Sequence, residues 1–189
     1  IGWNAKAVEE LVRSKESWIK SKQAAVSDRL LNRKFEFNNG ELHQVWGSEV
    51  PLINTSNSGR RGVKRSQYAL VINAPAESSL DTREKLLTAW YAQEVKSAAL
   101  ALVDKWEPVL GVKAGRLSAQ KMKSKWGSCN IQNGNIRLNS ELAKFPKGAL
   151  EHVIVHELVH LLEPSHGKRF YSLMDEFLPN WKALKALTG

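Results

Sequence analysis

The sequence predicts an α+β fold, because segments of helical and strand-like pattern follow one another in the order helix, strands, helix, strands, helix, helix. Two observations support this class. Apolar residues between positions 86 and 106 recur with a period near 3.6, as in a helix with one buried face. Between positions 35 and 75, short apolar runs are separated by turn-forming Asn and Gly, which is typical of strands. The length of 189 residues suits one domain, or one domain with a small appendage.

The N-terminal region, residues 1–80, is expected to hold a helix and a small β region. Residues 5–31 contain no Gly or Pro and carry apolar side chains at roughly helical spacing, which predicts an amphipathic helix. After it, Phe35–Phe37 leads into Asn38-Asn39-Gly40, a hairpin signal. Further strands are expected within the stretches HQVWGSEVPL and SQYALVINAP, so this region should form a small antiparallel sheet.

A long core helix is expected to begin the second region, residues 81–189. Ser79 or Asp81 can cap its first turn with a side-chain oxygen. Pro108 and Gly111 are expected to close this helix, because proline lacks the N–H that the helix needs and glycine readily adopts the left-handed conformation.

The rest of this region is expected to add strands at residues 115–122 and 134–139, followed by two helices at residues 147–163 and 167–187. A turn containing Asn and Gly separates the two strands. Pro164 separates the two helices, because the residue before a proline is pushed away from helical geometry.

Composition limits the classes of function. The net charge of +9 favours an anionic partner such as a nucleotide or nucleic acid, although a surface that is simply basic explains it equally well. No apolar run approaches the ~20 residues that cross a bilayer, so we expect no membrane segment. Cys129 is the only cysteine, which excludes an internal disulfide and predicts a reducing, cytoplasmic location. The oligomeric state is not predicted.

The segment His156-Glu157-Leu158-Val159-His160 carries the chemistry. Residues four apart on a helix share a face, so the imidazoles of His156 and His160 can reach one ion at about 2.0–2.1 Å. Glu157 lies beside that face and can take a proton from a water molecule at the ion, which makes it the candidate general base. The flanking residues are almost all apolar, so the helix should be buried, and buried polar side chains need partners that a metal supplies.

A catalytic zinc usually has three protein ligands and one open position. Pro164 ends the motif helix, and the following turn can bring His166, which comes after five intervening residues, back to the ion beside His160. We therefore expect His166 to be the third ligand. Asp175 or Glu176 on the next helix is the alternative, because some zinc sites take a carboxylate there.

Two further residues near the motif have candidate roles. His152 lies four residues before His156, but it is about 12 Å from His160 along the helix axis, so one ion cannot bind all three. His152 is expected beside the site. Tyr171, five residues after His166, is a candidate donor to the oxyanion that forms during hydrolysis; packing against the core is its alternative role.

Residues 126–139 contain further candidates for the site. Trp126 is expected in the wall or the core, and Gly127 allows a close approach of the backbone. Cys129 is expected to be a small core residue, because a fourth protein ligand would close a catalytic zinc site. Arg137 and Asn139 alternate on a strand and therefore share a face, where they either orient a substrate or point to solvent.

Four blocks resemble the YgjP-like family of zinc metallopeptidases and occur in the family's order: KSKWGSC (123–129), GNIRLNSEL (134–142), VIVHELVHL (153–161) and HGKRFYSLM (166–174). The similarity covers about residues 84–181 closely and extends more loosely back to about residue 36. The chain is also distantly similar to the SprT-like and WLM domains. The resemblance implies a minimal zincin-like fold, with a small, mostly antiparallel sheet packed on the HExxH helix. It also implies Zn²⁺ held by His156, His160 and His166, with Glu157 as the base.

This resemblance predicts a zinc-dependent hydrolase, most directly a metallopeptidase that acts on a peptide or protein. The residues themselves predict only that a metal activates water. The same site among basic side chains could instead hydrolyse a phosphoanhydride bond of a nucleotide, since phosphates need cationic partners. Similarity to SprT-like and WLM domains suggests a third function, processing or binding of DNA-associated proteins.

Overall fold

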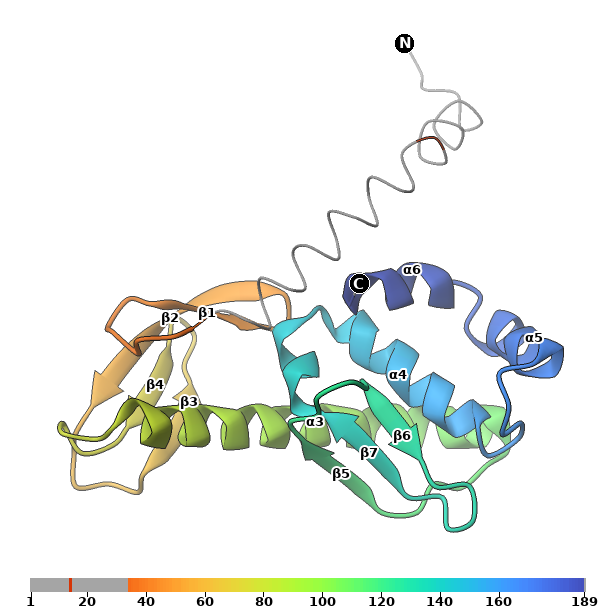
Figure 1. The fold of residues 1–189 in the computed structure, drawn as a ribbon, viewed down its shortest axis with the longest axis horizontal. Helices are drawn as coiled ribbons and strands as arrows, with labels where there is room; N and C mark the ends of the chain where they lie inside the picture. The colour runs from red at the N-terminus through yellow and green to blue at the C-terminus, as the bar shows by residue number, and fades with distance from the viewer. Residues whose placement is uncertain (1–13, 15–33, 189) are drawn as a thin grey trace.

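The computed structural model describes residue 14 and residues 34–188, and it confirms the α+β class (Figure 1). The helix expected at residues 5–31 lies outside the described residues, except for Ser14. The strands are β1 (Leu42–Val45), β2 (Ser48–Thr55), β3 (Gly62–Arg65), β4 (Leu70–Asn73), β5 (Leu117–Gln120), β6 (Gly127–Cys129) and β7 (Ile136–Asn139). The helices are α3 (Leu80–Leu110), α4 (Lys147–Val159), α5 (Lys168–Phe177) and α6 (Trp181–Lys185), with the 3₁₀ helices η1 (Ser140–Lys144) and η2 (Ala186–Thr188).

The first four strands form one sheet in the order β1-β2-β4-β3. β1 pairs antiparallel with β2, and β3 pairs antiparallel with β4, as the sequence predicts. β2 and β4 run parallel, because β4 and not β3 lies beside β2. The sheet is therefore mixed, with β3 at one edge and β1 at the other.

The hairpin of this sheet lies at Trp46-Gly47, so the prediction of a hairpin at Asn38-Asn39-Gly40 is wrong. Trp46 and Gly47 both have positive φ, 52° and 80°, which suits the tight two-residue turn between paired strands. Contacts outside the hairpin hold Trp46 in this rare conformation. Its backbone N–H donates to the Ala143 carbonyl at 2.6 Å, and its indole N–H donates to Glu94 at 3.3 Å. The hairpin turn is thus fastened to η1 and α3.

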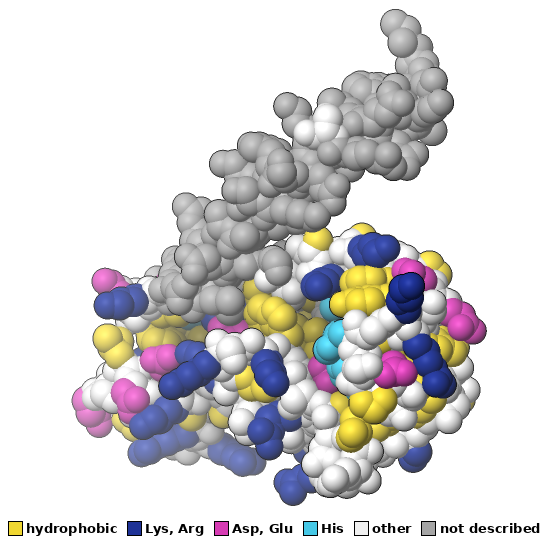
Figure 2. Space-filling model, turned by 45° about the vertical axis from the view of Figure 1, so that its right-hand side comes forward, with side chains coloured by type: hydrophobic (Ala, Val, Ile, Leu, Met, Phe, Trp, Pro, Cys, Tyr) yellow, Lys and Arg dark blue, Asp and Glu magenta, His cyan; other side chains and the backbone are white. Residues whose placement is uncertain are grey.

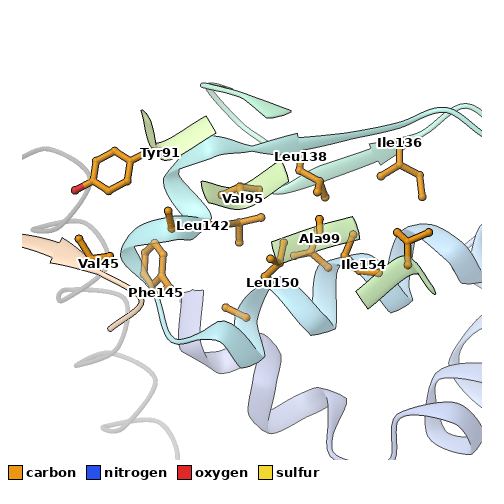
Figure 3. Packing of buried hydrophobic residues seen from close by; sticks show 14 of the residues in the cluster. Val45, Tyr91, Val95, Ala99, Ile136, Leu138, Leu142, Phe145, Leu150 and Ile154 are labelled. Atoms are coloured by element: carbon orange, nitrogen blue, oxygen red, sulfur yellow. The ribbon is translucent and has the colours of Figure 1, made fainter. Parts of the chain in front are cut away.

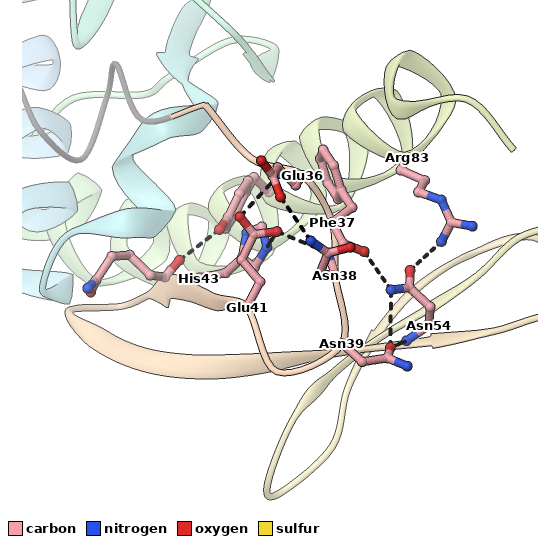
Figure 4. Close-up of polar contacts among 10 residues, drawn as sticks. Glu36, Phe37, Asn38, Asn39, Glu41, His43, Asn54 and Arg83 are labelled. Carbon is pink, nitrogen blue, oxygen red and sulfur yellow. Dashed lines mark hydrogen bonds and ion pairs between the residues drawn. The ribbon is translucent and has the colours of Figure 1, made fainter.

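Phe35–Phe37 form no strand, because side chains bind the backbone groups of this segment (Figure 4). The Glu41 carboxylate accepts hydrogen bonds from the backbone N–H groups of Glu36 at 3.2 Å and Asn38 at 3.3 Å. The Asn54 amide donates to the carbonyl of Phe37 at 2.7 Å. These bonds compete with strand pairing and turn the chain toward β1.

α3 lies along both sheets of the molecule (Figure 1). Ser79 caps it, as one of the two predicted candidates, and its Oγ accepts a hydrogen bond from the Thr82 N–H at 3.3 Å. Pro108 and Gly111 mark the end of the helix, as the sequence predicts, and the helix itself runs to Leu110. Proline removes only one N–H in this last turn, and Gly111 (φ 66°) then ends the helix in the left-handed conformation.

A second sheet contains three strands in the order β5-β7-β6 and contacts both α3 and α4. β5 pairs parallel with β7, whereas β6 pairs antiparallel with it. The sequence predicts β5 and β7 within residues 115–122 and 134–139 but gives no indication of β6, whose length is too short to show a periodic pattern. β6 is an edge strand of this sheet, and it contacts α4.

The expected helix at residues 147–163 is α4, which ends earlier than predicted, at Val159. The next turn is tighter than an α-helix, because the N–H groups of Leu161 and Leu162 bond to carbonyls three residues back. Pro164 then prevents any further helical turn. This tight turn directs the chain back toward α4.

The single helix expected at residues 167–187 is wrong, because α5 and α6 are separate helices there. Pro179 lies between them and lacks the N–H that a continuous helix would need. The break lets α6 fold back onto α4. Among the described residues, no helix combines the length and apolar character that would span a membrane.

One hydrophobic core connects α3, α4 and both sheets (Figure 3). Along α3 its buried members recur every four residues, which explains the helical period of the sequence. The core residues labelled in Figure 3 are Val45, Tyr91, Val95, Ala99, Ile136, Leu138, Leu142, Phe145, Leu150 and Ile154. The division into residues 1–80 and 81–189 remains a prediction, and this core includes residues from both.

The contact between the hairpin turn and the start of α4 gives a test of the fold. An added Cβ at Gly47 would lie 2.8 Å from Pro146 Cγ, in addition to the strain of φ 80°. We expect Gly47→Ala to lower the free energy of unfolding by about 2–4 kcal/mol, as the sum of backbone strain and overpacking. Urea unfolding followed by circular dichroism measures it.

Gly40→Ala is the matched control, because Gly40 has nearly the same φ, 84°, and nothing lies within 4 Å of its added Cβ. It should cost only the backbone strain, about 1 kcal/mol. If both variants lower the free energy of unfolding by the same amount, crowding against Pro146 adds no cost and Gly47 is not packed closely against it.

Candidate metal centre

Three imidazoles converge at the C-terminal end of α4. His156 lies in the last turn of the helix, His160 is its C-cap, and His166 precedes α5. The Nε2 atoms of His156 and His166 are 3.0 Å apart, and one ring nitrogen from each of the three residues lies within 4.8 Å of the others. Tetrahedral ligands about 2.0–2.1 Å from one ion would be about 3.4 Å apart. The three side chains therefore fit a metal ion after a small inward rotation.

The alternative third ligands do not belong to this cluster. Asp175 accepts a hydrogen bond from the Trp181 indole at 2.8 Å and lies 3.9 Å from the Lys182 ammonium. These contacts hold α5 against α6. The turn at Pro164, by contrast, brings His166 to the face of α4, as the sequence predicts for a third ligand.

The ring orientations are fixed by two neighbours. Nδ1 of His160 lies 3.2 Å from the Glu163 carbonyl oxygen, which can only accept, so Nδ1 carries the proton and Nε2 keeps a free lone pair. Phe170 is almost fully buried, and its ring lies 4.9, 4.8 and 4.6 Å from the rings of His156, His160 and His166. It forms an apolar floor under all three. Phe170 is a site residue that the metal-ligand spacing does not reveal; its place four residues after His166 is the signal in the sequence that points to it.

Burial keeps these imidazoles in the form that binds metals. Burial, with smaller contributions from neighbouring cationic groups, lowers the pKa of His156 to about 3. It also lowers the pKa of His160. Both rings are therefore neutral near pH 7, and only a neutral imidazole offers a lone pair to an ion.

Glu157 lies in the same cavity as the three histidines, which has a volume of about 450 Å³. Its side chain is buried, and burial raises the pKa of the carboxyl to about 7. The Lys125 ammonium and the backbone N–H of Cys129 act in the opposite direction and favour the carboxylate. A carboxyl group with a pKa near neutrality can both take and return a proton, as a general base must.

Glycine at position 127 makes room for this carboxylate. An added Cβ there would lie 2.6 Å from Glu157 Oε1 and 2.7 Å from Val153 Cγ1. Only a residue without a side chain lets β6 approach α4 so closely, as the sequence suggests for Gly127. Trp126 also lines the cavity, and its ring packs edge-on against Phe145 at 5.2 Å.

Cys129 lines the cavity but is not part of the histidine cluster. Burial, with the nearby Glu157 carboxylate, raises the pKa of its thiol to about 11. The group is therefore a neutral thiol near pH 7, whereas a metal ligand would be a thiolate. The expectation of a small core residue holds only in part, because Cys129 is half-buried and packs against the edge of the core.

Tyr171 is the predicted site residue that lies outside this cavity. Its ring stacks on Trp181 at 5.7 Å and meets Phe170 edge-on at 5.5 Å, and the residue is 41% exposed. His152 is buried beside the site, as expected. The His152 ring lies 5.9 Å from the ring of His156 and stacks on the ring of Trp181.

Arg137 and Asn139, which the sequence places on one face of β7, differ in burial. Arg137 is exposed, whereas Asn139 is buried where β7 ends and η1 begins. The Asn139 amide donates to the carbonyls of Met122 and Lys125, both at 3.0 Å, and its Oδ1 accepts from the Met122 N–H. Asn139 therefore holds the loop before β6 and does not face a substrate.

One family of known proteins matches almost the whole chain. A family model described as YgjP-like, metallopeptidase domain, matches residues 1–187. Among solved structures, the chain is similar to the metallopeptidase zymogen abylysin of Pyrococcus abyssi, with a TM-score of 0.43, 17% identity, and coverage of 46% of this chain and 88% of that one. It is also similar to the metallopeptidase zymogen jannalysin of Methanocaldococcus jannaschii, with a TM-score of 0.41, 20% identity, and coverage of 46% and 89%. No curated protein matches the chain.

The convergence of the three imidazoles predicts the outcome of single substitutions. His156→Ala, His160→Ala and His166→Ala should each lower the affinity for zinc by more than about 100-fold, because loss of a mere supporting partner already costs 10–100-fold. Metal analysis after dialysis, and competition with a chromophoric chelator, measure the affinity. His152→Gln, on the same helix, should keep zinc as the wild type does. Undiminished zinc in His166→Ala would exclude His166 as the third ligand.

Proposed function

Because the chain belongs to the YgjP-like family of metallopeptidases, we propose that it hydrolyses peptide bonds with a zinc ion held by His156, His160 and His166. In this proposal Glu157 is the general base. The observation that carries it is the convergence of three imidazoles beside a buried carboxylate in one cavity. Zinc is proposed because a set of imidazole ligands with an open position suits it, although other divalent ions accept the same ligands.

In this proposal the zinc ion, Glu157 and Phe170 each have a separate role in the reaction. Zinc at this site supplies a Lewis acid that polarises a carbonyl group and acidifies water. The Glu157 carboxylate takes a proton from the attacking water and can return it to the departing amine. The pKa of this group, about 7, suits both transfers near neutral pH. Phe170 excludes water from the far side of the imidazoles, which strengthens the electrostatic interactions in the site.

β6 is proposed as the binding surface for an extended peptide. Within the described part of the chain, its partner strand β7 lies on one side only, and its residues line the cavity with the histidines. An edge strand can pair with an added strand through its free N–H and C=O groups. A peptide bound in this way would pass directly over the three histidines.

Tyr171 is proposed as the donor to the oxyanion. Its position next to Phe170, the floor under the three imidazoles, supports this role. Its partial exposure leaves the hydroxyl free of the core. A change of the stack with Trp181 would be needed to bring it over the cavity, so its role depends on a movement of α5 or of the side chain.

Hydrolysis of a nucleotide phosphoanhydride is the second candidate. Lys125 and Lys185 line the cavity of the metal centre, and cationic side chains stabilise the charge of a phosphoryl group.

A cytoplasmic location remains a prediction from the single cysteine, Cys129.

The proposed activity can be tested with a panel of peptides, casein and nucleoside triphosphates, using zinc-loaded protein. We expect peptide cleavage that falls by about 10²–10⁴-fold in Glu157→Gln, because the base is lost while the zinc ligands remain. Tyr171→Phe should lower kcat by at least about 10-fold with zinc retained, as loss of an oxyanion donor does. Intact peptides together with Glu157-dependent cleavage of triphosphates would exclude the peptidase and support the second candidate.

Gly127→Ala tests the position of the base separately. The new Cβ would meet the Glu157 carboxylate, and moving a flexible side chain is cheaper than moving β6. We expect kcat/KM to fall by about 100-fold with zinc content unchanged, since a displacement of about 1 Å at a catalytic group has this effect. Gly167→Ala is the control, because its added Cβ would meet only Ser165 Oγ at 3.8 Å. Equal activity of the two variants would show that the close approach of Gly127 to Glu157 does not set the position of the base.

A further inference from the structure

A second cavity lies beside the metal cavity, next to the loop before β6. The second cavity has a volume of about 660 Å³, and the two share Lys125 and Trp126. The loop at residues 121–126 borders the second cavity and brings Lys121 and Lys123 to it as well. Figure 2 shows histidine side chains in a hollow of the surface, with lysine and arginine side chains around it. The cleft therefore has a basic extension beside the metal centre.

The charges of this loop are largely uncompensated. Lys123 and Lys125 are exposed and form no ion pair with any other described residue. Lys121 lies 3.6 Å from Glu84, an exposed pair that contributes little. The acid in the wall of the second cavity, Glu141, is buried and already paired with Lys144. An anionic ligand would thus meet free ammonium groups.

The loop is also held in place. Asn139 binds it through hydrogen bonds to Met122 N–H (3.2 Å), Met122 C=O (3.0 Å) and Lys125 C=O (3.0 Å). Asn139 is itself buried, at the end of β7. The backbone that carries Lys123 and Lys125 is therefore ordered before any ligand binds, which lowers the entropy cost of binding.

A further cation lies at the same end of the cleft. α6 packs on the first turns of α4, where an added Cβ at Gly148 would lie 2.8 Å from Leu184. Lys185 of α6 lines the metal cavity, and its charge is felt by His152 and His156. At the other end of α4, the cavity is bordered by Pro164 and Ile131. The lysines that line the two cavities therefore lie on one side of the metal centre, whereas Lys168 and Arg169, which follow His166, line neither cavity.

The direction of β6 relates this asymmetry to the substrate. β6 and α4 contact each other and run in the same direction, with the 121–126 loop at the start of β6 (Figure 1). A peptide that adds to β6 in the commoner antiparallel direction runs from the end of β6 toward this loop. The residues that follow the cleaved bond would then pass Lys125 and Lys123, at about 3.3 Å per residue.

We propose that the enzyme selects peptides with Asp or Glu among the first few residues after the cleaved bond, bound by Lys123, Lys125 and Lys185. This inference rests on the proposed peptidase function. Its physical basis is that carboxylates gain charge-assisted contacts in a partly enclosed cleft with no free acid on that side. The same lysines could hold phosphate groups, so a nucleotide is the rival ligand that the test must separate.

The test is cleavage of a peptide library with one varied position on each side of the cut, read by mass spectrometry with zinc-loaded protein. We expect enrichment of Asp and Glu after the cut, and kcat/KM about two- to fivefold higher for a Glu peptide than for its Gln counterpart, as exposed ion pairs give. Lys125→Gln and Lys185→Gln should each reduce this ratio. Lys123→Glu combined with Lys125→Glu should reverse it, in favour of Lys peptides.

Lys182→Gln is the matched control, because Lys182 is exposed on α6 and does not line the cavity. Binding of a labelled acidic peptide to zinc-loaded Glu157→Gln, measured by fluorescence anisotropy, gives a readout without turnover. It should weaken with salt and in Lys125→Gln. Cleavage without a preference, or with an acidic preference before the cut, overturns the inference and leaves the peptidase intact. If no peptide is cleaved and triphosphates are hydrolysed in a way that depends on Lys125, both the acidic preference and the peptidase function are excluded.

Discussion

The cost of burying polar side chains on α4 is the constraint on which the rest of the site depends. His156 and Glu157 lie on a helix whose seven apolar side chains are all buried. Burial keeps the imidazole neutral and raises the pKa of the carboxyl to about 7. The same desolvation therefore prepares a metal ligand and a proton acceptor on adjacent residues. Both effects require a dry environment, which Phe170 and β6 provide on two sides of the helix.

The close approach of β6 to α4 depends on features that lie outside the motif. Gly127 removes the side chain that would strike Glu157. Asn139 ties down the loop that leads into β6, so that the edge strand starts in the right place. Trp46 and Gly47 fasten the first sheet to η1, which leads directly into α4. A short path of contacts thus connects the N-terminal sheet with the metal helix.

Spacing made the centre of the site predictable, whereas tertiary packing decided the rest. His156, Glu157 and His160 follow from the geometry of one helix, and Pro164 indicates where the chain must turn toward a third ligand. β6 is too short to show a period, so no local pattern could reveal the edge strand beside the metal. The turn between β1 and β2 was also not predictable from local pattern, because it lies at Trp46-Gly47 and not at Asn38-Asn39-Gly40. Trp46 has an unfavourable φ for its type, and only hydrogen bonds to distant residues stabilise it.

The charge of the cleft acts on the base as well as on a substrate. Lys125 opposes the effect of burial on Glu157 and favours the carboxylate, so its removal would raise the pKa of the base further. A lower rate in a Lys125 variant therefore has two physical origins that a single substrate cannot separate. A change in the base affects Glu and Gln peptides equally and cancels in their ratio. A lost contact with the substrate carboxylate changes the ratio itself. Lys123 lines the second cavity and not the one that holds Glu157, so its removal should change only that ratio.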